Sequence, residues 1–130
     1  MNVNIYLNGK LWNGKGYNIN GDMEFEIKDG KGNIKEYNYD DKLIYKGEYS
    51  NGEKNGKGKG YKNGKLEFEG EYLYDKFLKG KYYINEKLEY NGEFLYNKKW
   101  NGKGYDESGN IIYELINGMI MVIYYLKVNI

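Results

Sequence analysis

The sequence predicts an all-β fold, an elongated single-layer antiparallel sheet of tandem β-hairpin repeats with about 22–24 residues in each unit. Three observations predict it. A short sequence recurs along the chain, apolar and polar side chains alternate within it, and Asn-Gly or Asp-Gly pairs separate the alternating stretches. A helical fold is disfavoured because glycine is frequent and alanine is absent.

The recurring sequence is a Gly-Glu-aromatic step that begins at Gly47, Gly70 and Gly92, 23 and then 22 residues apart. One hairpin is only marginally stable, whereas hairpins placed side by side can bury an aromatic face. We expect these three glycines to lie beneath aromatic rings, where a side chain would crowd the rings. An Asn-Gly-Lys-Gly step follows at 55–58 and 101–104. The full set of repeat glycines is Gly47, Gly56, Gly58, Gly70, Gly80, Gly92, Gly102 and Gly104.

The two ends of the chain match each other as well. Residues 12–30 align without gaps on residues 100–118, with Trp12 on Trp100. We therefore interpret the whole chain, 1–130, as a single repeat array. Its units are a degenerate N-terminal part at 1–41, with 22–41 the most irregular block, clear units at 42–64, 65–86 and 87–109, and a degenerate C-terminal unit with an apolar end at 110–130.

Within a unit the side chains alternate with a period of two, which is typical of strands. In 66–72, Phe68 and Tyr72 point to one face and three glutamates to the other. Residues 88–94 repeat this pattern and place Glu89 on the polar face. A stripe of aromatic residues is either the core of a single-layer sheet, which we favour, or a binding groove. The predicted ladder consists of Trp12, Tyr45, Tyr49, Phe68, Tyr72, Tyr90, Phe94 and Trp100.

Missing residue types exclude much chemistry. The chain has no cysteine, histidine or arginine, and therefore no disulfide, no thiolate nucleophile, no Ser-His-Asp triad and no common zinc site. We interpret the glutamates of 66–72 as a polar strand face rather than as paired catalytic carboxylates. Residues 9–16 resemble a phosphate-binding loop, but Gly16 stands where Ser or Thr is required. We expect no enzymatic activity, no cofactor and no metal site.

The net charge of +1 lacks the basic excess of a nucleic-acid-binding protein, so we expect no nucleic-acid partner. The N-terminus shows no secretory signal, and the longest apolar run, 119–126, is shorter than the roughly 20 residues of a membrane helix. We expect a cytoplasmic protein that could associate with a membrane or with the cytoskeleton. An apolar strand at an open sheet edge favours self-association, which predicts a homodimer through the C-terminal unit.

Five lysines near the predicted turns of the first clear unit suggest a basic cluster, Lys54, Lys57, Lys59, Lys62 and Lys65. Near an anionic membrane each lysine could contribute on the order of 1 kcal/mol of binding free energy. The alternative is a solvated turn in a lysine-rich chain, and nearby glutamates weaken any net field.

Units of this form resemble the MORN repeat (membrane occupation and recognition nexus). The segment YKGEYSNGEKNGKGKGYKNG at 45–64 is the best copy, and 68–86 and 90–109 are good copies in which Asp75 and Asn97 replace the middle glycine of the motif. The resemblance covers the middle of the chain well and the ends weakly. It implies that each unit is a β-hairpin and that successive hairpins form one twisted, rod-like antiparallel sheet.

The resemblance implies a function only broadly, because MORN arrays occur in membrane–cytoskeleton scaffolds, in dimeric rods that bind partners, beside enzymes and, in a bacterial variant, in proposed antitoxins. The leading prediction is a non-enzymatic scaffold or protein-interaction module with an unidentified protein partner. Peripheral binding to anionic membrane lipids is the alternative. A carbohydrate-binding aromatic repeat, suggested by residues 80–94, and an antitoxin-like repeat protein are further alternatives.

Overall fold

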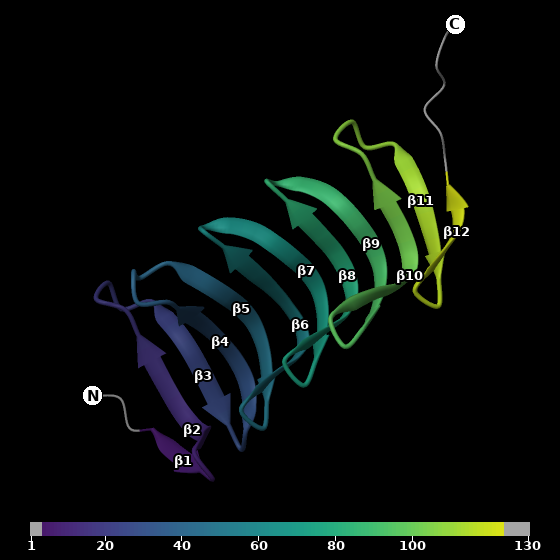
Figure 1. The fold of residues 1–130 in the computed structure, drawn as a ribbon. Coiled ribbons are helices and arrows are strands. Elements are labelled where there is room, and N and C mark those ends of the chain that lie inside the picture. The colour runs from purple at the N-terminus through teal and green to yellow at the C-terminus, as the bar shows by residue number, and fades with distance from the viewer. Residues whose placement is uncertain (1–3, 124–130) are drawn as a thin grey trace, which may run out of the picture.

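Residues 4–123, which the computed structural model describes, form a single open antiparallel sheet without helices (Figure 1). The predicted all-β fold is confirmed. Within these residues each strand pairs only with the strands that precede and follow it in the sequence. The strands are β1 (Ile5–Leu7), β2 (Lys10–Tyr17), β3 (Met23–Lys28), β4 (Lys31–Tyr37), β5 (Leu43–Ser50), β6 (Glu53–Lys62), β7 (Lys65–Leu73), β8 (Lys76–Ile84), β9 (Lys87–Leu95), β10 (Lys98–Tyr105), β11 (Ile111–Ile116) and β12 (Met119–Ile123).

The hairpins follow one another along a long axis, with β1 at one end of the sheet and β12 at the other (Figure 1). The sheet is a single layer, and within residues 4–123 no second layer covers either of its faces. Each face must therefore bury or solvate its own side chains. This arrangement is the elongated sheet of consecutive hairpins that the repeats predict.

Most neighbouring strands are joined by two-residue turns in which both residues have positive φ, as in the type I′ turn of β-hairpins. At one of them Asn63 has φ 52° and Gly64 has φ 77°. Five of these turns, among the described residues, carry the predicted Asn-Gly or Asp-Gly pair. Three carry no glycine and lie at 74–75, 85–86 and 96–97. In these three, non-glycine residues such as Glu86, with φ 69°, adopt the left-handed conformation.

Some Asn-Gly pairs lie inside strands and anchor a neighbouring turn. Asn13 belongs to β2, and its Oδ1 accepts a hydrogen bond from the backbone N of Asp29 at 3.0 Å. Asn101 in β10 does the same for the backbone N of Asn117 at 2.8 Å. These bonds hold the turn of one hairpin against the strand that precedes it, so they set the stacking of successive hairpins.

The three longer loops, at 18–22, 38–42 and 106–110, are each capped by the side chain of their first residue. Asn18 Oδ1 accepts hydrogen bonds from the backbone N of Asn20 and of Asp22, at 2.9 Å each. Asn38 and Asp106 cap their loops in the same way. A short polar side chain thus satisfies the backbone donors that each loop leaves free.

A row of glycines crosses the middle of the sheet from β5 to β10. Each pairs with the glycine of the next strand, in the order Gly47, Gly58, Gly70, Gly80, Gly92 and Gly102. A Cβ on Gly70 would lie 2.6 Å from Gly80 Cα, and a Cβ on Gly92 would lie 2.5 Å from Gly102 Cα. The close approach of these strands therefore depends on glycine, in agreement with the packing role expected from the sequence.

Aromatic rings lie over this glycine row on one side of the sheet, which we call the aromatic face. The fully buried side chains are Tyr45, Phe68 and Tyr90. The Tyr45 ring lies against Gly58, and Tyr45 OH donates a hydrogen bond to Glu48 O at 2.9 Å. Tyr90 makes the equivalent bond at 2.8 Å. Gly56 lies against the side chain of the same Glu48. A bare backbone thus lets each ring lie flat on the sheet.

Beyond both ends of the glycine row, larger apolar residues lie in the same line of pairing. Leu115 in β11 is buried opposite Gly102, whereas Ile27 in β3 is buried opposite Gly32, outside that line. In β4 the pairing is shifted, so that Ile34 and not Gly32 lies opposite Gly47. This shift falls in the block that is most irregular in sequence.

The apolar C-terminal unit supplies the last described strand, β12, at an open edge of the sheet. Met119, Ile120 and Met121 are 64%, 58% and 55% exposed. Residues 124–126 of the predicted apolar run lie outside the described residues. Association of two copies through this unit stays a prediction.

Replacement of Glu86 by glycine should stabilise the protein. Glu86 has φ 69°, and its side chain makes no hydrogen bond or ion pair within residues 4–123. The left-handed conformation costs a non-glycine residue about 1–2 kcal/mol, and the greater freedom of glycine in the unfolded chain offsets part of the gain. We expect the free energy of unfolding in urea to rise by about 0.5–1 kcal/mol.

Asp75→Gly is the control for this substitution. Asp75 also has positive φ, 69°, but its Oδ1 accepts a hydrogen bond from the backbone N of Lys54 at 2.7 Å. Loss of this bond should cancel most of the gain. Destabilisation by Glu86→Gly would contradict the argument from backbone strain.

Gly70→Ala should destabilise the protein by about 1–3 kcal/mol, because the new Cβ meets backbone that cannot move without separating β7 from β8. Gly60→Ala is the matched control. A Cβ on Gly60 would lie 2.6 Å from Tyr72 OH, and its next contact would be at 3.9 Å, so a small shift of one side chain relieves it. Equal unfolding free energies for the two variants would refute the glycine requirement.

Candidate functional site

The structure divides the predicted aromatic ladder between two places. One cluster on the aromatic face contains T-shaped pairs with ring centroids 5.1–5.9 Å apart. Its members from the predicted ladder are Tyr45, Tyr49, Phe68, Tyr72, Tyr90 and Phe94. Trp12 and Trp100 lie apart from it, against the turn glycines Gly30 and Gly118. The two tryptophans thus hold turns in place.

The cluster is a core rather than an open groove. Tyr45, Phe68 and Tyr90 have no exposed surface, and Tyr72 and Phe94 are 3% and 5% exposed. A ring with no exposed surface offers no face to a ligand. The core interpretation of the ladder therefore fits the structure better than the groove interpretation does.

Three further aromatic residues join this core, and sequence reasoning did not select them. Phe77 stacks on Phe68 with ring centroids 4.2 Å apart, and Tyr82 and Tyr113 pack at the edge of the cluster. The Tyr113 ring lies against Gly104, the last of the repeat glycines. Phe77 occupies the repeat position that carries lysine in the other two clear units. Because the residue type differs between units, a comparison of the three repeats does not identify Phe77 as a core residue.

The five lysines of the predicted basic cluster lie in three different places. Lys54 lies on the aromatic face, with Nζ 5.0 Å from the centroid of the Tyr45 ring. Lys57 and Lys59 lie on the opposite, polar face. Lys62 and Lys65 pair across the two strands beside the turn at 63–64. These lysines therefore do not form one cationic surface.

Lys99 closes the far end of the aromatic core. Its Nζ forms an ion pair with Glu89, lies 3.2 Å from Tyr113 OH, and lies 5.5 Å from the centroid of the Tyr90 ring. Burial by itself lowers the pKa of Lys99, but the hydrogen bonds with Glu89 and Tyr113 outweigh it, so the pKa is raised. The ammonium group stays charged and lies over the face of the Tyr90 ring in a cation–π contact.

The prediction that Glu89 lies on the polar face is wrong. The register between β8 and β9 shifts between Tyr82 and Tyr83, so that Glu89 has no partner in β8. Such a β-bulge adds one residue to a strand and reverses the direction of its side chain. Glu89 therefore turns toward the aromatic face, where it meets Lys99. The same kind of shift between Gly60 and Tyr61 leaves Glu67 without a partner in β6, so its predicted place on the polar face is wrong as well.

The tyrosines of the core are not poised for proton transfer. Burial raises the pKa of Tyr90 to about 12 and raises the pKa values of Tyr45 and Tyr72 well above their usual range. These hydroxyls are therefore neutral at ordinary pH. Among residues 4–123, no group of three or more acidic side chains is placed to hold a metal ion.

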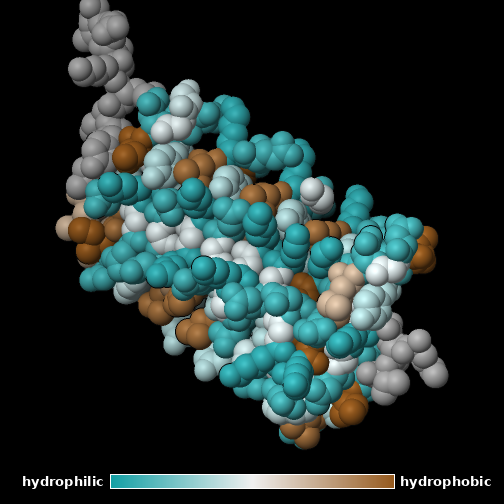
Figure 2. Space-filling view, turned by 180° about the vertical axis from the view of Figure 1, so that it is seen from behind, coloured by the Kyte–Doolittle hydropathy of each residue, from teal (hydrophilic) through white to brown (hydrophobic). Residues whose placement is uncertain are grey.

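The polar face carries a groove of about 1090 Å³ that crosses the sheet from β3 to β9. Backbone of Gly47, Gly58, Gly70, Gly80 and Gly92 lines it, so the glycine row that supports the core on one face is the floor of the groove on the other. Hydrophilic residues cover most of the face seen in Figure 2, and a paler band runs between them.

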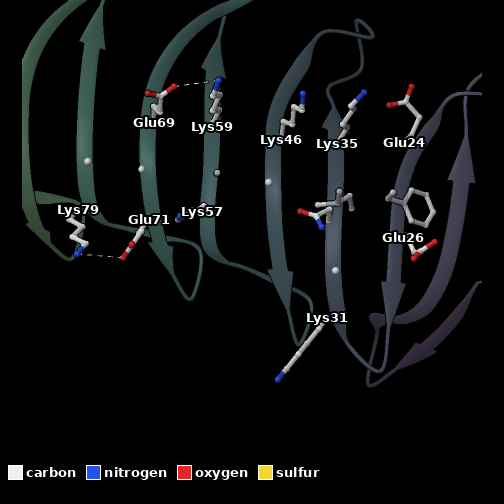
Figure 3. Close-up of a pocket in the computed structure, with 18 of the residues that line it drawn as sticks. Glu24, Glu26, Lys31, Lys35, Lys46, Lys57, Lys59, Glu69, Glu71 and Lys79 are labelled. Carbon is white, nitrogen blue, oxygen red and sulfur yellow. Dashed lines mark ion pairs between the residues drawn. The ribbon is translucent and has the colours of Figure 1, made fainter.

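Two rows of side chains form the walls of the groove, one on each side of the glycines (Figure 3). Glu24, Lys35, Lys46, Lys59 and Glu69 follow one another along the first wall, which we call the upper wall. Glu26, Lys57, Glu71 and Lys79 lie along the second, the lower wall. Ion pairs join Lys59 to Glu69 at 3.4 Å and Glu71 to Lys79 at 3.9 Å.

The groove is the feature that sequence reasoning missed. Glu69 and Glu71 were expected on a polar face, and they do line it, but the alternation gave no sign that this face is hollowed. The available signal was the spacing of Gly47, Gly58 and Gly70, which places glycines opposite one another once the register is known. The glycine row leaves the aromatic face without side chains along that line, so the strands can approach one another and the sheet can curve.

Comparison with family models, with curated proteins and with solved structures finds no match to this chain. The relation to MORN repeats therefore rests on the motifs in residues 45–109 and stays a prediction. The part of the chain that the structure describes contains no helix long and apolar enough to cross a membrane.

Raising the pH above about 10 should destabilise the protein. Tyrosines of the unfolded chain ionise near their ordinary pKa of about 10, whereas burial raises the pKa of Tyr72 in the folded state. Above that pH the folded state holds more protons than the unfolded state, so the free energy of unfolding falls as the pH rises. Denaturant midpoints measured across this pH range, with the absorbance of tyrosinate, check the prediction.

Tyr72→Phe should flatten this pH profile, because Tyr72 OH makes no hydrogen bond within residues 4–123 that the substitution would remove. Tyr39→Phe should leave the profile unchanged, since the Tyr39 side chain is fully exposed. An identical profile for the parent and Tyr72→Phe would show that this hydroxyl does not contribute.

Proposed function

We propose that the protein is a non-enzymatic interaction module that binds an extended polypeptide segment along the groove of its polar face. The observation that carries the proposal is the groove itself, which continues across seven neighbouring strands, from β3 to β9. Between β5 and β9 its floor is glycine backbone, Phe25 and Ile34 line it at β3 and β4, and charged side chains form its walls. Such a site can recognise a chain by shape and charge, and it contains no group that would transform a ligand.

The dimensions of the groove suit a short extended peptide. Neighbouring strands lie roughly 4.8 Å apart, so a groove from β3 to β9 is on the order of 29 Å long. An extended peptide of about nine residues covers this distance, since each residue advances about 3.3 Å. A segment of this length is long enough for specific recognition by a single array of hairpins.

The floor explains why contacts with the partner would come mainly from the walls. In the glycine row the backbone groups already bond within the sheet, so they have little left to offer a ligand. The flat floor admits the partner backbone, and Lys57, Lys59, Glu69, Glu71 and Lys79 on the walls meet its side chains. The MORN resemblance supports this proposal, because partner binding is one of the uses of MORN arrays.

The alternative functions use features that the structure buries or divides. A carbohydrate site would need open aromatic rings, and the ladder rings Tyr45, Phe68 and Tyr90 are buried. An anionic membrane would need the lysines of the predicted basic cluster on one surface, and they lie in three places. The interaction module therefore accounts for more of the geometry than either alternative. An antitoxin-like role would be one form of such a module.

Selection of random linear peptides on phage against the immobilised full chain tests the proposal. The parent should enrich ligands that Asn91→Trp no longer binds, because Asn91 is exposed and lines the groove, and an indole there would fill it. Lys62→Trp, at the exposed turn beside 63–64, should retain them. Circular dichroism on both variants controls for folding.

Two outcomes would count against the groove. A folded parent that enriches no ligand would show that it does not bind linear peptides. Ligands that bind both variants equally well would place the binding surface elsewhere on the protein.

A further inference from the structure

The charges on the polar face form an alternating pattern over most of the groove. From β6 to β9, each strand carries one sign of charge and its neighbour carries the other. Lys59 lies directly opposite Glu69, and Glu69 lies opposite Lys81 on the upper wall. On the lower wall Glu71 lies opposite Lys79, which lies opposite Glu93. Opposite charges on facing residues stabilise strand pairing, so this pattern serves the sheet itself.

The pattern breaks at one place on the upper wall. Lys35 in β4 lies opposite Lys46 in β5, and Lys46 lies opposite Lys59 in β6. We call these three residues the lysine triplet. All three line the groove, where Figure 3 shows Lys35, Lys46 and Lys59 side by side. Like charges on facing residues destabilise strand pairing, so the triplet works against the sheet that contains it.

Two members of the triplet, Lys35 and Lys46, make no ion pair with any residue of 4–123. Lys59 forms an ion pair with Glu69 at 3.4 Å. Lys46 has a lysine on each side, and its side chain makes no ion pair, hydrogen bond or cation–π contact with any residue of 4–123. It is exposed in the wall of the groove. An anionic group placed there would meet up to three ammonium groups.

We propose that the lysine triplet binds carboxylate side chains of an acidic, extended segment of a partner protein. This inference rests on the proposed function and names the chemistry of the partner. Lys57, across the floor on β6, adds a fourth positive charge to the same part of the groove. Alternate side chains of an extended segment lie about 6.8 Å apart on one face, so two acidic residues fit within the roughly 10 Å from β4 to β6.

The surroundings of the triplet favour a peptide over larger polyanions. Glu24 and Glu26 on β3 border the basic region on one side, and Glu69 and Glu71 on β7 border it on the other. A nucleic acid that follows the groove would bring phosphates against these carboxylates within a few ångströms. A membrane surface is broad, and it would meet the same acidic borders. A peptide can instead carry its acidic residues only where the lysines lie.

Fluorescence anisotropy with a labelled peptide tests this proposal. The probe has about nine residues, to match the length of the groove, with only two glutamates, two positions apart, and glycine elsewhere. A second probe carries glutamine in place of glutamate. The parent should bind the glutamate probe at least about tenfold more tightly than the glutamine probe, and added salt should weaken the binding.

Lys46→Glu should weaken binding of the glutamate probe by at least about tenfold, because it reverses the charge at the centre of the triplet. The matched control is Lys62→Glu, which makes the same change in net charge outside the groove. Both substitutions replace one member of a facing lysine pair, Lys46 with Lys59 or Lys62 with Lys65. Lys62→Glu should keep the affinity within about twofold of the parent.

Thermal unfolding separates loss of binding from loss of structure. Glutamate at position 46 would face Lys35 and Lys59, so the Tm of Lys46→Glu should equal or exceed that of the parent, most clearly at low salt. A variant that is as stable as the parent and binds the acidic probe less well would show that the triplet serves binding at the expense of the sheet.

Several results would overturn the proposal. These are equal binding of the two probes by the parent, unchanged affinity in Lys46→Glu, or equal losses in Lys46→Glu and Lys62→Glu, which would reflect net charge alone. Binding to phosphatidylserine vesicles that Lys46→Glu abolishes, without binding to the acidic probe, would assign the triplet to lipid instead. If the phage ligands occupy the groove but lack acidic residues, the acidic partner is refuted and the interaction module stands.

Discussion

The structure depends on the close approach of paired glycines in adjacent strands. A single-layer sheet has no second layer to bury its apolar side chains, so its core must form on one face. Rings of residues such as Tyr45 and Tyr90 can lie flat only where the backbone beneath them carries no Cβ, and the row from Gly47 to Gly102 provides that surface across β5 to β10. With the rings flat, Tyr45 contacts Tyr72 of the next unit, and the hydroxyls of Tyr45 and Tyr90 reach backbone carbonyls in their own strands. The core, the strand spacing and the register are therefore consequences of one choice of residue.

The polar face lies on the other side of the same glycine row. A Cβ on these glycines would point to the aromatic face, so on the polar face only the residues before and after each glycine project from the sheet, and they form the two walls of the groove. The core on one face and the candidate binding site on the other thus share one strip of backbone. The charges on the walls of the groove serve two roles, stability of the sheet and, as we propose, binding of a partner. Pairs such as Lys59 with Glu69 strengthen the sheet, whereas the lysine triplet centred on Lys46 weakens it and is explained better by a partner.

The features that the sequence predicted are those with local causes. Alternation within 66–72 and Asn-Gly pairs such as Asn63-Gly64 depend on residues adjacent in the chain, and they predicted the strands, the hairpins and the open sheet. The features that it missed depend on register between strands. The bulge that turns Glu89, the facing of Lys35, Lys46 and Lys59, and the entry of Phe77 into the core each require knowledge of which residues lie opposite one another. The glycine-free turns at 74–75 and 96–97 were also not predicted, because the backbone groups that their side chains bind lie one hairpin away.

Pairing only between strands adjacent in the sequence has a consequence for how such a protein forms and changes. All strand pairings within residues 4–123 join neighbouring segments of the chain, so the contact order is low and little chain must be closed into loops before these pairings form. The stability of such an array is approximately a sum of its hairpins and their interfaces. Duplication of one hairpin would lengthen the groove by two strand spacings, roughly 10 Å, without disturbing the strand pairings on either side. The reach of the protein along a partner is thus set by the number of hairpins, while the cross-section of the groove stays the same.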